Sequence, residues 1–171
     1  MTTSTPTPPL RRRLGVWTLG FLAFPLAGIV GGAVGPVDDV FSAALGGALS
    51  GLVLGAGQSL ASLGTLRPAR WVPATTVGMG AGPALGAAVV GYRTSLPDLA
   101  LMGLLTGVPL GLAQALAFPA GPRYRAAWAL LVPPLWALGW TVTTLAGVDM
   151  ASRYTIFGST GALTVTALAG L

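Results

Sequence analysis

The chain has 171 residues, of which 53% are hydrophobic and only 8% are charged, with nine arginines, no lysine and four aspartates. A soluble domain of this length carries about a quarter charged residues, so the composition indicates an integral membrane protein and excludes an ordinary soluble one. Cysteine and histidine do not occur, which removes disulfides, thiolate nucleophiles, imidazole bases and the commonest metal ligands. We therefore expect no cofactor and no metal site.

Charged residues and Pro/Gly clusters divide the chain into six apolar segments. They follow a Thr/Pro-rich stretch, residues 1–10, that we interpret as a disordered cytoplasmic tail. The segments are Leu14–Gly35, Val40–Gly64, Trp71–Gly91, Leu99–Phe118, Ala126–Val148 and Tyr154–Leu171. A spanning helix needs about 20 residues, and only the last segment falls short of that length. The sequence thus predicts an all-α fold, in which residues 11–171 form a single integral membrane bundle of about six transmembrane helices.

The arginines are distributed unequally over the two sides of this predicted bundle. One side holds Arg11, Arg12, Arg13, Arg67, Arg70, Arg123 and Arg125. The other side holds Arg93, Arg153, Asp38, Asp39, Asp98 and Asp149. Because arginines near helix ends resist translocation, the pattern predicts a multi-pass protein of the inner (cytoplasmic) membrane with its N-terminus in the cytoplasm.

The same distribution bears on partners. Arginines scattered between apolar segments form no continuous stripe, so we expect no nucleic-acid partner. We expect Arg67, Arg70, Arg123 and Arg125 to lie beside the head groups of anionic membrane lipids. An alternative for the first segment is a cleaved signal sequence with Arg11–Arg13 as its basic region, although its apolar run exceeds the usual 7 to 15 residues.

Two stretches of the chain share one spacing of small residues. "GALSGLVLGAGQ" at 47–58 and "GLLTGVPLGLAQ" at 103–114 both read G-x-x-x-G-x-x-x-G-x-x-Q, and each is followed by arginine and tryptophan. A first copy begins with Arg12 and Trp17, and a last copy keeps Gly158, Ala162 and Thr166 but has Ala169 in place of the glutamine. The pattern predicts three parallel helical-hairpin repeats, over residues 11–64, 67–120 and 123–171.

Helix geometry gives the shared spacing a structural meaning. The spaced positions fall within about 80° of one another on a helix, so each set forms one face. The two faces are Gly47, Gly51 and Gly55 with Gln58, and Gly103, Gly107 and Gly111 with Gln114. Small residues let helix backbones approach closely in lipid, so we expect these faces to hold the second and fourth helices together.

The glutamines have two interpretations. The simpler is a hydrogen bond between helices that fixes Gln58 and Gln114 at the same depth. The alternative is that Gln58 and Gln114 line a solute path.

A third glycine stripe, Gly78, Gly82 and Gly86, lies on the third segment. We expect it to dock against another subunit, either a membrane protein partner or a second copy in a homo-oligomer. The alternative is contact with the second or fourth segment of the same chain.

Tryptophans occur on the first, third and fifth segments and not on the others. Trp17, Trp71 and Trp128 follow the arginines of one side, as aromatic anchors at a membrane interface do. We therefore expect the odd-numbered helices to face lipid and the even-numbered helices to lie inside.

The motifs "GLVLGAGQSL…RPARWVPATTVG" and "GVPLGLAQAL…RYRAAW" resemble a group of uncharacterised multi-pass bacterial membrane proteins with a Gly-spaced helix ending in Gln, a basic loop and a Trp-led helix. The resemblance covers roughly residues 45–140 and implies a small repeat-built bundle with no known activity. The chain departs from that pattern because no second aromatic residue follows Gln58 or Gln114.

Three classes of function are compatible with these features. A structural or accessory subunit of a larger membrane assembly, joined through Gly-rich helix faces, is the first. A passive channel or small-solute transporter is the second, and a lipid-associated membrane enzyme is the third. The hydroxyl groups lack a His, Lys or Cys base, and every carboxylate falls in a loop, so we expect no enzyme.

Overall fold

The computed structural model describes residues 9–147, 156 and 158–170, and every regular element within these ranges is helical. The elements are α1 (Leu10–Leu19), the 3₁₀ turn η1 (Gly20–Leu22), α2 (Ala23–Gly32), α3 (Val40–Ala61), α4 (Pro68–Val89), α5 (Leu96–Ala117), α6 (Pro122–Leu145) and α7 (Ser159–Ala169). The all-α prediction is confirmed for this part of the chain. Asp149, Arg153 and most of the expected tail lie outside the described residues.

Four of the described helical segments are long and apolar enough to cross a membrane: Leu10–Gly32, Val40–Ala61, Leu96–Ala117 and Pro122–Leu145. Helix α4 has 22 residues, but its glycines, prolines, threonines and Arg70 make it less apolar. Helix α7 has only 11 residues. Length and composition thus support a membrane protein through four of the six expected spans.

The first span is a broken helix. It begins at Leu10, earlier than expected, so the three arginines Arg11–Arg13 are helical. The 3₁₀ turn η1 interrupts it before Pro25. Since proline has no N–H to donate to the preceding turn, the helix tightens here and then resumes as α2.

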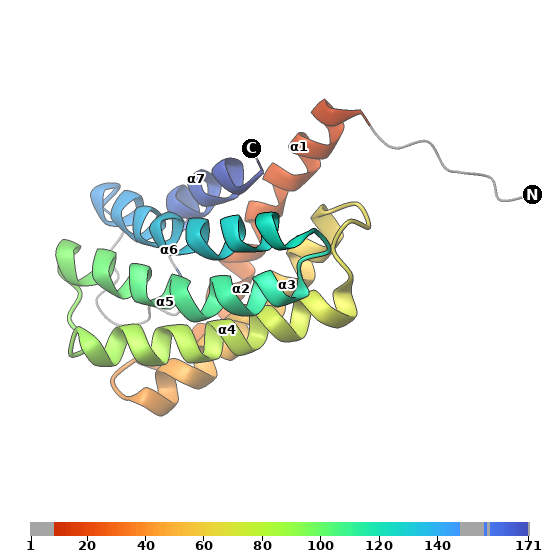
Figure 1. Cartoon of the computed structure of the whole chain (residues 1–171). Coiled ribbons are helices and arrows are strands. Elements are labelled where there is room, and N and C mark those ends of the chain that lie inside the picture. Colours follow the sequence, from red (N-terminus) through yellow and green to blue (C-terminus); the bar gives the residue numbers. More distant parts are fainter. Residues whose placement is uncertain (1–8, 148–155, 157, 171) are drawn as a thin grey trace, which may run out of the picture.

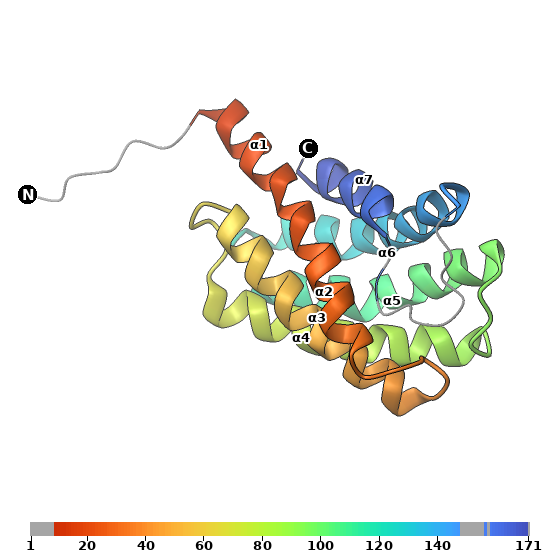
Figure 2. The ribbon, with the colours of Figure 1, turned by 180° about the vertical axis from the view of Figure 1, so that it is seen from behind.

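The helices are arranged as a closed ring. Each of α3, α4, α5 and α6 contacts the next helix along the chain; α2 contacts α3, and α7 contacts α6 on one side and α1, η1 and α2 on the other. The two views show α7 and the C-terminal end of the chain beside α1 (Figures 1 and 2). Helices α3 and α5 are not direct backbone neighbours.

The two glycine faces pack against the following helix and not against each other. A Cβ built at Gly51 would lie 2.6 Å from Met79 Cβ and 2.7 Å from the Thr75 carbonyl oxygen, both on α4. Gly47 and Gly55 meet α4 as well, and Gly103, Gly107 and Gly111 meet α6. The expectation that these faces join the second and fourth helices is therefore wrong, because consecutive helices of the ring occupy them.

The glycine stripe of α4 is also occupied within the chain. Cβ atoms built at Gly78, Gly82 and Gly86 would lie 2.7, 2.7 and 2.6 Å from backbone atoms of α5. Expected docking of this stripe against another subunit is thus wrong, and the alternative contact with the fourth span is found. The stripe needs no external partner because α5 already fills it.

Candidate functional site

Gln58 and Gln114 meet inside one end of the ring. Gln114 Nε2 donates a hydrogen bond to Gln58 Oε1 over 3.3 Å, although the two residues lie 56 positions apart. This is the expected bond between glutamines of different helices. It links α3 and α5 across the interior, where their backbones do not touch.

Each glutamine also receives a hydrogen bond from a tryptophan of the following helix. Trp71 Nε1 donates to Gln58 Oε1 over 2.9 Å, and Trp128 Nε1 donates to Gln114 Oε1 over 3.1 Å. Gln114 Nε2 donates further to Thr75 Oγ1 over 3.0 Å, and the Gln114 side chain is fully buried. The two glutamines and their partners form a polar layer in which the polar groups bond to one another.

The third position of this layer is built differently. Trp17 Nε1 donates to the backbone carbonyl oxygen of Thr166 on α7 over 2.9 Å. Ala169, which stands where the glutamine would be, offers no acceptor from its side chain. A Cβ built at Gly170 would lie 2.6 Å from Trp17 Cδ1, so the ring packs closely on the end of α7.

The tryptophans therefore point inward, and their expected role as lipid-facing anchors of the odd helices is wrong. Trp71, Trp136 and Trp140 are at most 4% exposed. The even helices α3 and α5 meanwhile expose large aliphatic residues, with Leu60 80% and Leu116 79% exposed. The physical reason is that an indole N–H buried in a bundle needs an acceptor, and the glutamines and the α7 backbone supply it.

Three aromatic rings brace the layer. Phe118 stacks on Trp128 with ring centroids 5.3 Å apart and an interplanar angle of 9°. Trp71 lies 5.9 Å from Trp128 and 6.1 Å from Phe118. The rings fix the orientation of the indole donors that serve both glutamines.

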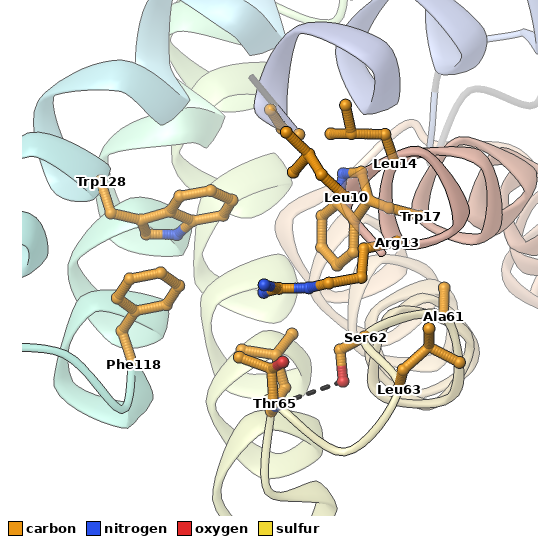
Figure 3. Close-up of a pocket in the computed structure, with 13 residues that line it drawn as sticks. Leu10, Arg13, Leu14, Trp17, Ala61, Ser62, Leu63, Thr65, Phe118 and Trp128 are labelled. Carbon is orange, nitrogen blue, oxygen red and sulfur yellow. Dashed lines mark hydrogen bonds between the residues drawn. The ribbon is translucent and has the colours of Figure 1, made fainter. Parts of the chain in front are cut away.

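A cavity of about 230 Å³, here called the mouth cavity, lies above this layer at the end of the ring that carries most of the arginines. It is lined by Leu10, Arg13, Leu14, Trp17, Ala61, Ser62, Leu63, Thr65, Leu66, Phe118, Trp128, Ala169 and Gly170. Arg13 extends from α1 toward the side of the cavity formed by Thr65, Phe118 and Trp128 (Figure 3). Sequence reasoning missed this site; the alanine at position 169 was the available signal.

The ring axis narrows beneath the mouth cavity. A second hollow of about 20 Å³ shares Trp17, Trp128 and Ala169 with it and reaches Gln58, Gln114 and Thr166. That volume holds about one water molecule. Phe24 and Trp136 line the hollow with ring centroids 6.1 Å apart, so aromatic side chains fill the axis at this level.

Three of the four arginines expected at lipid head groups gather around a third hollow, of about 260 Å³. Arg67, Arg70 and Arg125 line it together with Phe118, while Arg123 does not. Arg125 Nε donates to the Phe118 carbonyl oxygen over 2.9 Å, which holds that guanidinium at the end of α5. The structure therefore forms a basic rim beside the mouth cavity, and Phe118 separates the two.

The opposite end of the ring carries the acidic residues that are described. Asp39 Oδ1 accepts a hydrogen bond from the Ser42 backbone N–H over 2.7 Å and caps α3. This hydrogen bond holds the pKa of Asp39 below its ordinary value. Arg93 and Asp98 form an ion pair at 3.0 Å. Within the described ranges no group of three His, Cys, Asp or Glu residues can hold a metal ion.

Comparisons of the chain with protein-family models, with curated proteins and with solved structures found no match. The arguments below therefore depend on the chemistry and packing of this chain alone.

Proposed function

We propose that this chain is a multi-pass protein of the inner (cytoplasmic) membrane, in which all six members of the ring lie across the bilayer. Support comes from the outer surface. Large aliphatic side chains are exposed on every helix from α1 to α7, including Leu19, Ile29, Leu60, Val77 and Leu130. An apolar surface of this extent on all sides suits lipid and is not typical of a soluble monomer.

The two helices that fail the apolar-span criterion have places in the ring. Helix α4 is packed between α3 and α5, and its 22 residues are about 33 Å long, enough for a crossing. Helix α7 is about 17 Å long and accounts for roughly half of one. In the proposal α7 is the returning arm of a third hairpin, and the Trp71–Gln58, Trp128–Gln114 and Trp17–α7 contacts are equivalent junctions of three repeats.

The orientation we propose puts the mouth cavity and the arginine-rich end in the cytoplasm. Single cysteines test it cleanly, because the chain has none. Asp38→Cys marks the acidic end, and Ala69→Cys, in the first turn of α4, marks the basic end. In sealed vesicles of known orientation, an impermeant thiol reagent added on the cytoplasmic side should label Ala69→Cys and spare Asp38→Cys. The reverse pattern contradicts the orientation.

Within that membrane we propose a non-catalytic role as a structural or accessory subunit of a larger assembly. One observation carries this proposal: buried polar side chains such as Gln58, Gln114 and Thr75 are hydrogen-bonded to one another, beside an axis filled by Phe24 and Trp136. Such an interior favours a rigid packing element over the passive channel considered above, whose path needs open polar lining.

The partner in this proposal binds the outer surface, because the glycine faces are used inside the ring. Gentle purification of the native protein followed by mass spectrometry should recover a stoichiometric membrane partner. Crosslinking adds the contact: Ala81→Cys lies on the exposed side of α4, and its neighbour Gly82→Cys lies on the buried side against Thr106. Intermolecular adducts through position 81 and not 82 support an external contact at α4. Purification as a monomer that carries only lipid contradicts the accessory role.

A further inference from the structure

The mouth cavity combines apolar walls with a single charged residue. Leu10, Leu14 and Leu66 provide aliphatic surface, Trp17, Phe118 and Trp128 provide aromatic surface, and Arg13 is the one charged side chain in the lining. We propose that this cavity binds the end of an acyl chain from an anionic membrane lipid, and that Arg13 holds the acidic head group at the rim. This assigns a specific lipid site inside the ring, beyond the accessory role.

The first argument is the charge of Arg13. Its described surroundings contain no acid, since Asp38, Asp39 and Asp98 cap or precede helices at the opposite end. Among the described residues the ion pair belongs to Arg93, and no hydrogen bond holds the Arg13 guanidinium. A guanidinium is well suited to bind a phosphate through parallel N–H groups. Arg13 is thus available to an anion from outside the chain.

The second argument is the chemistry of the aromatic walls. Trp128 and Trp17 have already donated their N–H groups, to Gln114 and to the Thr166 carbonyl oxygen. What these rings offer the cavity is therefore carbon surface, and the stacked pair of Phe118 and Trp128 makes it flat and rigid. Such walls favour a hydrocarbon chain over a polar solute.

The third argument is size and position. A volume of about 230 Å³ admits about eight groups the size of a water molecule or a methylene. This fits the end of one chain and not a complete two-chain lipid, so the head group has to stay at the rim. There the rim arginines Arg67, Arg70 and Arg125 continue the positive surface past Phe118.

The test uses the tryptophans in the lining as reporters. The full-length protein is placed in phosphatidylcholine nanodiscs doped with either brominated phosphatidylglycerol or brominated phosphatidylcholine, whose bromine atoms quench nearby indoles. We expect the anionic lipid to quench more strongly at equal content. Arg13→Gln should weaken that preference about fivefold, the effect of losing one arginine near an anionic surface.

Two further variants make the result specific. Arg12→Gln removes the same charge from the neighbouring position, which does not line the cavity, and should keep most of the preference. Thr65→Phe fills the cavity from an exposed loop position and should reduce quenching by the anionic lipid without changing stability. Equal quenching by both lipids, equal losses in the two arginine variants, or an unchanged signal in Thr65→Phe each overturns the proposal.

Discussion

The ring has two kinds of junction between helices, and they differ by one side chain. At the α3–α4 and α5–α6 junctions a glutamine accepts the indole N–H of the next helix, and the two glutamines bond to each other. At the α7–α1 junction Ala169 replaces the glutamine, and Trp17 bonds to a backbone carbonyl oxygen instead. The mouth cavity opens beside this third junction, so losing one polar side chain converts a packed contact into a space.

Breaking the close packing that both glutamine junctions share should have the largest effect. A Cβ at Gly107 would meet Pro133 and Val132 backbone atoms on α6, so Gly107→Leu forces α5 and α6 apart. Overpacking of this kind costs about 1 to 3 kcal/mol of unfolding free energy, and occasionally more. Reversible unfolding in detergent, followed by tryptophan fluorescence, measures it.

Gly32→Leu is the matched control for that substitution. It adds the same side chain to a helix at a position where a Cβ meets nothing within 4 Å. If Gly107→Leu and Gly32→Leu change stability equally, the packing account of the glycine faces is incorrect.

Removing Gln114 should have the next largest effect, and a larger one than removing Gln58. Gln114→Leu leaves the N–H of Trp128 without its acceptor and Thr75 without its donor, in a fully buried site. An unsatisfied buried donor costs about 1 to 3 kcal/mol. Gln58 is less buried, and bonds of this kind between membrane helices average well under 2 kcal/mol.

The comparison uses thermal unfolding of Gln114→Leu and Gln58→Leu at one pH. Equal destabilisation of the two variants would show that burial of Gln114 does not set its contribution. Loss of a transport phenotype with unchanged stability would instead support the channel interpretation of the glutamines.

Installing the missing side chain tests the third junction. Ala169→Gln places an acceptor next to Trp17 and adds volume between the mouth cavity and the small hollow beneath it. We expect a modest gain in stability, about 0.6 kcal/mol as for an average hydrogen bond between membrane helices, and weaker binding of the anionic lipid. Ala169→Leu, which fills space without an acceptor, separates the two effects. A loss of stability in Ala169→Gln alone would mean that the junctions are not equivalent.

The smallest effect is expected at the acidic end, where acid should loosen the cap of α3. Folding lowers the pKa of Asp39 below its ordinary value of 3.8 through its bond to the Ser42 N–H. The cap therefore contributes fully above that value, and the contribution is lost as the pH falls through the lower folded-state pKa. Asp39→Asn caps without titrating and should lose less stability on acidification, as measured by unfolding at a series of pH values. Parallel pH profiles for both proteins would contradict this cause.

The sequence predicts the helices better than it predicts their neighbours. Apolar length and the spacing of Gly51 and Gly107 suffice to predict helices with close-packed faces, because helix periodicity places those residues on one side. Which helix fills the face is a property of the closed ring. Gly82 is a good docking position in any setting, and only the fold shows that Thr106 occupies it.

The candidate site illustrates the same limit. The glutamine pair is predictable from its repeated position, but the inward direction of Trp71 is not, since an interfacial tryptophan and a hydrogen-bonded one look alike in a sequence. The mouth cavity depends on Ala169, Trp17 and Phe118, which lie far apart along the chain. Only ring closure brings them together.

The bond between Trp17 and the Thr166 carbonyl oxygen joins residues 149 positions apart. During synthesis the first helix is made long before its last neighbour exists, so α1 must wait in the membrane with one side uncovered while every other helix is inserted. Contacts of such long separation form late and slowly. Ribosome-bound chains that stop before α7 should therefore contain an accessible Trp17 and be the form of this protein most readily captured by an insertion chaperone or degraded by a membrane protease.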